Sequence, residues 1–142
     1  MYLLDTNVIC ELRLGRRADA RVRDWVRAQP QAALYISAIT LLEIEQGILL
    51  KARRDAQQGE RLRTWFRHQV IPSFERRTLA VDASVALTAA QLHVPNPAPE
   101  RDALIAATAL VHGFAVVTRN IGDFEGVSGL PRVNPWQGTR DR

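Results

Sequence analysis

The sequence predicts an α/β fold, built on a central, mainly parallel sheet of four to five short strands with helices on both faces. Three observations lead to this prediction. Short apolar runs alternate with longer helical segments along the whole chain, which is typical of strand–helix–strand units. The runs are apolar throughout, as expected for strands buried on both faces. The length corresponds to a single domain over residues 1–142, with about 135–142 expected as a flexible tail.

Glycine, proline and capping residues divide the first half of the chain into elements. Asp5 closes the first apolar run with a residue type that favours a helix N-terminus. Gly15 and Pro30 end two helical segments, and Ser37 can cap the next one. Gly59 is expected in the turn between a long helix and a second helix packed against it. The expected strands cover residues 2–4 and 34–36, and the expected helices cover residues 8–14, 19–29, 39–57 and 60–70.

The second half continues the alternation. Asp82 or Ser84 is expected to begin an alanine-rich helix that runs to about residue 93. A loop with prolines separates it from a second alanine-rich helix over residues 101–112, which Gly113 ends. In parallel sheets of this kind, ligands bind at the carboxyl ends of the strands, near the point where the strand order reverses. The remaining expected strands cover residues 78–81, 114–118 and 130–134.

The charge of the chain is basic and rests almost entirely on arginine. There are 19 basic and 15 acidic residues, a formal net charge of +4, and the pI is about 10.2. Lys51 is the one lysine, and guanidinium groups grip phosphate through two parallel hydrogen bonds. This balance favours a nucleic-acid partner, although a solvated, arginine-rich surface explains it equally well.

The sequence predicts a soluble, cytoplasmic protein without a membrane partner. No apolar run approaches the roughly 18 residues of a transmembrane helix, and the N-terminus lacks the basic segment of a signal peptide. Cys10 is the one cysteine, which leaves no intrachain disulfide and no cysteine-based zinc site.

Four acidic residues are candidates for a common site. Asp5 directly follows the first strand, and Asp123 follows the strand at 114–118 after a short loop. Asp102 lies in the first turn of a helix, and Glu43 lies inside an otherwise apolar helical segment. Each has a structural explanation of its own, as a cap, a turn residue or a partner of the helix dipole. Converging carboxylates repel one another, however, and a hard divalent cation such as Mg²⁺ relieves that repulsion and activates water for phosphodiester cleavage.

Four short motifs, in order along the chain, resemble those of the PIN-domain ribonucleases. Leu-Leu-Asp-Thr-Asn-Val-Ile at 3–9 resembles the first motif. Ser37, followed by Leu-Glu-Ile-Glu-Gln-Gly at 42–47, is similar to the second. Residues 102–109 and 117–124 resemble the third and fourth motifs. The resemblance is closest to the VapC-type toxins of bacterial type II toxin–antitoxin systems.

The resemblance implies a Mg²⁺-dependent endoribonuclease, in which Mn²⁺ can substitute, that cleaves RNA through a metal-activated water. It also implies a homodimer that a cognate VapB-type antitoxin holds inactive. Carried over by position, the catalytic acids are Asp5, Glu43, Asp102 and Asp123, of which Asp5 and Asp102 are the direct metal ligands. The supporting or substrate-binding residues are Thr6, Asn7, Thr118, Arg119 and Asn120.

The residues themselves leave three points undecided. Many PIN domains carry an acid two residues after the strand threonine, where this chain has Asn120, so either Asn120 or Asp123 completes the metal site. Glu43 and Glu45 lie about 200° apart around a helix, and periodicity does not choose between them, whereas the resemblance assigns Glu43. The alternative function is a non-catalytic α/β module that binds nucleic acid or a partner, with the acids serving as caps.

Overall fold

A five-stranded parallel sheet forms the centre of the protein. The structure, a computed structural model, describes residues 1–137. The strand order is β3–β2–β1–β4–β5, and each neighbouring pair is parallel. The predicted α/β class with four to five short strands is therefore confirmed. The strands are β1 (Tyr2–Leu4), β2 (Leu34–Ser37), β3 (Thr78–Leu79), β4 (Ala115–Val117) and β5 (Arg132–Val133).

The middle strand, β1, lies where the strand order reverses. Tyr2 is in register with Leu34 of β2 on one side and with Ala115 of β4 on the other. The chain leaves β1 for β2 and later crosses back to β4 on the opposite side. The carboxyl end of β1 is therefore the position at which parallel α/β sheets bind their ligands, and Asp5 follows directly there.

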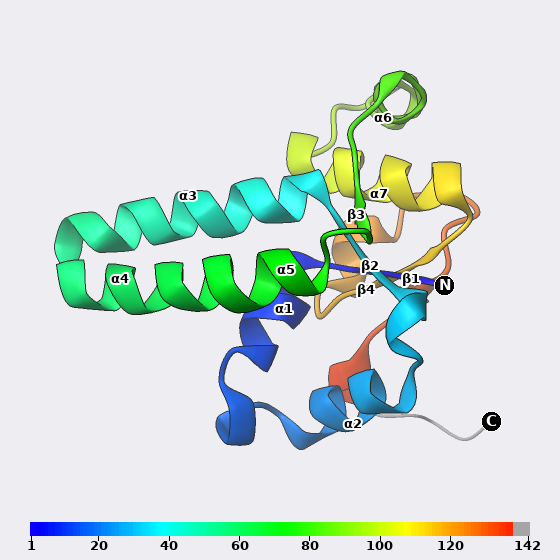
Figure 1. Cartoon of the computed structure of the whole chain (residues 1–142). Coiled ribbons are helices and arrows are strands. Elements are labelled where there is room, and N and C mark those ends of the chain that lie inside the picture. Colours follow the sequence, from blue (N-terminus) through cyan, green and yellow to red (C-terminus); the bar gives the residue numbers. More distant parts are fainter. Residues whose placement is uncertain (138–142) are drawn as a thin grey trace.

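Helices cover both faces of the sheet (Figure 1). On one face, α6 and α7 pack against each other, whereas α1 and α2 lie on the other face. Asp82 caps α6 by accepting a hydrogen bond from the Val85 N–H, and Gly113 ends α7 in a left-handed conformation, as the sequence predicts. These helices are α1 (Thr6–Leu12), α2 (Ala20–Ala28), α6 (Ala83–Leu92) and α7 (Glu100–His112).

Alternate residues of the strands fill two separate cores. Leu3 and Val116 are fully buried with Ile105 of α7, and the following residues, Leu4 and Val117, are buried with α1 and α2. Both faces of β1 and β4 are therefore apolar, which explains the uninterrupted apolar runs at these positions in the sequence.

A helical hairpin of α3 (Ala38–Arg54) and α4 (Ala56–Trp65) extends beyond the sheet (Figure 1). The prediction that Gly59 forms its turn is wrong, because Asp55 does so and caps α4 through the Gln58 N–H. Gly59 lies inside α4, where an added Cβ would come within 2.6 Å of the Ala52 Cβ. The glycine is there because the two helices touch, not because the chain turns.

Shorter helical segments complete the fold. After α4 the chain continues as a π-helical segment, η3, and the short helix α5. No helix among residues 1–137 is both long and apolar enough to cross a membrane. These segments are η1 (Gly15–Arg17), η2 (Gln31–Ala33), η3 (Phe66–Val70), α5 (Ile71–Ser73), η4 (Ile121–Phe124) and η5 (Pro135–Gln137).

The predicted tail is wrong at its first residues. Residues 135–137 form the 3₁₀ turn η5, and Trp136 is only 8% exposed in the core that includes Val22 of α2. Burial of the large indole holds this segment against the domain. The rest of the predicted tail, 138–142, lies outside the described residues.

Candidate active site

Asp5 is held at the end of β1 by three hydrogen bonds. Its Oδ1 accepts one from the Thr6 N–H at 2.8 Å. Its Oδ2 accepts one from the Thr118 hydroxyl at 2.8 Å and one from the Asn7 side-chain amide at 3.2 Å. The residue is only 7% exposed. Asp5 therefore caps α1 and also presents a fixed carboxylate at the point where the strand order reverses.

The supporting residues predicted after β1 and β4 form one hydrogen-bonded frame. The Asn7 amide also donates to the Thr118 hydroxyl at 3.3 Å, and its Oδ1 accepts from the Arg119 N–H at 3.2 Å. The Asn120 N–H donates to the Thr118 hydroxyl at 3.0 Å. Asn120 thus contributes through its backbone, and the frame fixes the two loops beside Asp5.

Glu43 faces the site and Glu45 does not. The Thr6 hydroxyl donates to Glu43 Oε1 at 2.8 Å, and Arg101 Nη1 lies 4.0 Å from Glu43 Oε2. Glu45 instead pairs with Arg67 of η3 at 3.1 Å. The contacts of α3 with α1 on one side and with η3 on the other separate two residues that periodicity left equivalent.

The four predicted acids are near enough for the charges of the others to act on Asp5 and Asp102. Burial raises the pKa of Asp5, against the hydrogen bonds from Thr118 and Thr6, and the charges of Glu43 and Asp123 raise it further. Burial also raises the pKa of Asp102, followed by the charges of Asp123, Asp5 and Glu43. Carboxylates whose charges raise the pKa values of both Asp5 and Asp102 share a region of negative potential.

The donor set fits a loosely held hard cation. Within residues 1–137, no three acidic, histidine or cysteine side chains form a group that could hold a metal ion by themselves. Mg²⁺ does not need such a cage, because it keeps several waters and binds through one or two carboxylates and a substrate phosphate. A carboxylate offers about four lone-pair positions, and the hydrogen bonds to Asp5 among the described residues use three. Asp5 therefore keeps one position for a cation.

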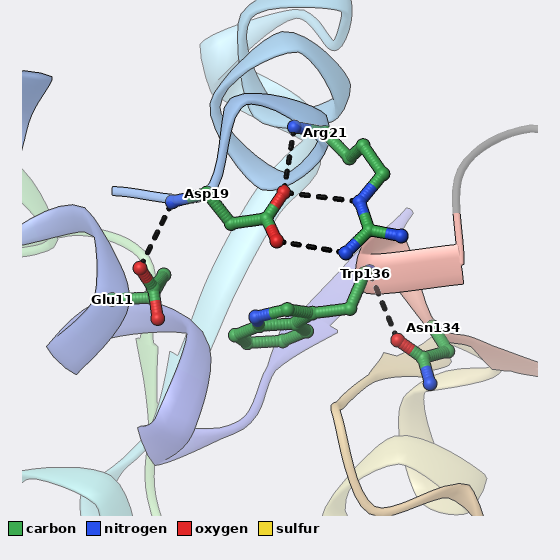
Figure 2. Close-up of polar contacts among 5 residues, drawn as sticks. All are labelled: Glu11, Asp19, Arg21, Asn134 and Trp136. Carbon is green, nitrogen blue, oxygen red and sulfur yellow. Dashed lines mark hydrogen bonds and ion pairs between the residues drawn. The ribbon is translucent and has the colours of Figure 1, made fainter. Parts of the chain in front are cut away.

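Two residues beside the site, Asn134 and Trp136, were not identified from the sequence. The Asn134 amide donates to the Arg119 carbonyl at 3.3 Å. Asn134 Oδ1 accepts from the Trp136 N–H at 2.9 Å (Figure 2). The Arg119 guanidinium carbon lies 5.4 Å from the centre of the Trp136 ring, within the range of a cation–π contact. No local pattern marks either residue, because only the fold brings η5 to the loop after β4.

The Trp136 side chain extends toward the start of α2 (Figure 2). There, Asp19 caps α2 and forms an ion pair with Arg21 at 2.9 Å, while its own N–H donates to Glu11 at 3.0 Å. The Arg21 hydrogen bonds lower the pKa of Asp19 to about 2. This network orders the start of α2, the helix against which the C-terminal turn η5 packs.

Comparison with known proteins agrees with the geometry. Residues 2–130 match the model of the PIN domain family. The plasmid stability protein StbB of Pseudomonas syringae pv. tomato is 39% identical, covering 96% of this chain and 99% of StbB. The VapC ribonuclease Y4jK of Sinorhizobium fredii is 36% identical, covering 96% of this chain and 99% of Y4jK. A solved toxin–antitoxin complex from Klebsiella pneumoniae matches with a TM-score of 0.68 and 29% identity, over 95% and 98% of the chains.

Proposed function

The chain belongs to the PIN domain family, and from that premise we propose that it is a divalent-metal-dependent endoribonuclease, the toxin of a VapBC-type module. The observation that carries the proposal is Asp5, oriented by Thr118 and Asn7 at the strand-order reversal, with carboxylates nearby that raise its pKa. The similarity to a protein named VapC ribonuclease supports RNA as the substrate. The arginine-rich, net basic composition of the chain supports it too.

Asp5 and Asp102 would hold Mg²⁺, or Mn²⁺ in its place, with Glu43 and Asp123 adding negative charge around it. When bound, the cation supplies positive charge to the scissile phosphate and lowers the pKa of the attacking water. The chain supplies orientation: the Thr118 and Asn7 hydrogen bonds fix the Asp5 carboxylate, and the Thr6 hydroxyl fixes Glu43.

Arg119 is the proposed phosphate ligand. Its backbone is tied to Asn7 and Asn134 beside the acids, and its exposed guanidinium can donate two parallel hydrogen bonds to a phosphate. A basic group at this position offsets the repulsion between RNA and the acidic cluster. The proposed role of Arg119 is therefore binding and alignment of the substrate, not proton transfer.

The proposed protein partners are a VapB-type antitoxin and a second copy of this chain. An antitoxin inhibits by placing an arginine or lysine among the acids, since a cation there competes with the metal. Leu49 and Leu50 of α3 are 50% and 58% exposed and give apolar surface for a partner. The proposed compartment is the cytoplasm, where RNA substrates are present.

Cleavage of RNA by the purified chain tests the proposal. We expect cleavage in Mg²⁺ or Mn²⁺, none in EDTA, and none by Asp5→Asn, which removes a charge at almost constant volume and still permits helix capping. Glu45→Gln is the matched control, because it also neutralises one acid but lies away from the site. Cleavage in EDTA, or full activity of Asp5→Asn, contradicts the metal mechanism. RNA binding without cleavage would instead support the non-catalytic alternative.

A further inference from the structure

A cavity of about 450 Å³ lies beside the acidic cluster, between α6, α7 and the segment after β4. Asp102 and Asp123 line part of it, so it is continuous with the proposed active site. Leu92 and Val127 contribute apolar walls. None of the steps proposed above for catalysis uses this space.

We propose that the cavity receives one nucleobase of the RNA, next to the phosphate that is cleaved, and so contributes to the choice of cleavage site. The inference rests on the proposed ribonuclease function. When the scissile phosphate lies at the carboxylates, the base of the adjoining nucleotide is one ribose away, beside Asp102 and Asp123. The volume lies within the roughly 300–1,000 Å³ of small-molecule sites, and a single base fits it.

The charge of the lining favours a neutral ring over a phosphate. Among the described residues that line the cavity there is no arginine, lysine or histidine, and the charged ones are Asp102 and Asp123. A phosphate inside it would face two carboxylates without a basic partner. A base is uncharged, so it can enter the cavity while its phosphate stays outside with the metal and Arg119.

The apolar part of the lining suits a flat ring. Ala103 and Ala106 of α7 line the cavity and are almost completely buried, and their small side chains leave room above the helix. Leu92 and Val127 add apolar contacts at the sides. Unstacked bases of single-stranded RNA are bound in this manner, by contacts to the ring and hydrogen bonds to its edge.

Polar side chains at the rim can read the edge of the base. Thr88 and Gln91 lie one turn apart on α6 and share a face, and Ser128 comes from the segment after β4. The Gln91 amide carries both a donor and an acceptor, the combination with which side chains recognise base edges. Gln91 is therefore the residue that we assign to sequence preference.

The test uses the full chain and an RNA randomised on both sides of a cleavage position, with sequencing of the products. Gln91→Leu keeps the approximate volume, removes the amide and changes an exposed residue. Gln69→Leu in η3 is the matched control, an exposed glutamine outside the cavity. We expect Gln91→Leu to change the preference at one flanking position by about tenfold or more, the value of one good base contact, and Gln69→Leu to behave as the wild type.

A second variant tests occupancy of the cavity independently of hydrogen bonding. Ala98→Leu places a larger apolar side chain at the lining. We expect it to raise KM for the preferred RNA and to leave the melting temperature close to that of the wild type. Unchanged sequence preference in Gln91→Leu together with unchanged KM in Ala98→Leu would overturn the proposal. The proposal would also be overturned if Gln91→Leu and Ala98→Leu changed only the oligomeric state, because the cavity would then belong to a contact between two copies of the chain.

Binding of nucleotides separates this inference from the proposed function. Nucleoside 5′-monophosphates are added to the wild type while the methyl NMR signals of Leu92 and Val127 are recorded. Shifts in the wild type that are lost in Ala98→Leu support the base site even if the chain cleaves no RNA, in which case only the proposed function fails. The absence of shifts with all four monophosphates at millimolar concentration overturns the base site, whether or not RNA is cleaved.

Discussion

Gly59→Ala is expected to destabilise the protein, although glycine is normally unfavourable inside a helix. Replacing a helix-interior glycine by alanine ordinarily stabilises by about 0.5–1 kcal/mol. Here the new Cβ would meet the Ala52 Cβ at 2.6 Å and the Ala52 Cα at 2.7 Å, whereas ordinary contacts begin near 3.4 Å. Overpacking of a tight contact costs about 1–3 kcal/mol. The net loss is then about 0.5–2 kcal/mol, or roughly 2–6 °C in Tm for a chain of this size.

Gly47→Ala in α3 is the matched control with the opposite sign. It is the same substitution in the partner helix, but nothing lies within 4 Å of the added Cβ, so we expect a gain of about 0.5–1 kcal/mol. Urea and thermal unfolding followed by circular dichroism measure both variants. Adding Ala52→Gly to Gly59→Ala removes the contact with the Ala52 Cβ and should therefore recover part of the lost stability. The recovery is incomplete because the contact with the Cα of residue 52 remains. Equal stabilisation by Gly59→Ala and Gly47→Ala would refute the close approach of the two helices.

Three further predictions concern the site and its support. Glu43→Gln should abolish RNA cleavage and leave the Tm equal or higher, because one of the repelling carboxylates is removed. Glu45→Gln should keep most of the activity and lose an ion pair worth about 0–1 kcal/mol. Cleavage assays and melting curves distinguish the two variants. Arg21→Gln should raise the pKa of Asp19 from about 2 toward 3.8, as measured by NMR titration. In the wild type, the lowered pKa of Asp19 stabilises the folded state above pH 3.8, and this contribution is lost as the pH falls through 2. Trp136→Leu should lower the Tm, because the indole is buried in the core, and should raise KM for RNA by about two- to fivefold with little change in kcat, the value of a cation–π contact with the exposed Arg119 of about 0.5–1 kcal/mol. An inactive Glu45→Gln variant together with an active Glu43→Gln variant would contradict the assignment of Glu43. An unchanged pKa of Asp19 in Arg21→Gln would contradict the effect of the ion pair, and an unchanged KM in Trp136→Leu would contradict the role of Trp136.

The fold class and the caps follow from features that are local in the sequence. The apolar runs of β1, β2 and β4 lack alternation because these strands are covered on both faces, and this is visible without knowing which helix covers which face. Asp5, Ser37 and Asp82 accept hydrogen bonds from N–H groups at most three residues ahead, so residue type and position suffice to predict them. Asp5 could be placed at a strand end for the same reason.

The surroundings of the acids depended on the tertiary structure. Periodicity leaves Glu43 and Glu45 equivalent, and only the family resemblance favours Glu43; the contacts that distinguish them, with Thr6 for Glu43 and with Arg67 for Glu45, come from other elements of the fold. The role of Gly59 as a point of helix contact likewise requires Ala52 in the facing helix.

The main strands and helices, and the positions of Asp5 and Asp102 near the ends of such elements, can be predicted from the residues alone. How residues distant in the chain meet cannot: examples are Trp136 beneath Arg119, Thr118 on Asp5, and the cavity beside α6 and α7. Capping and burial act over a few residues and therefore leave a local pattern in the sequence. Contacts across the domain depend on the packing of whole elements, which no short pattern encodes.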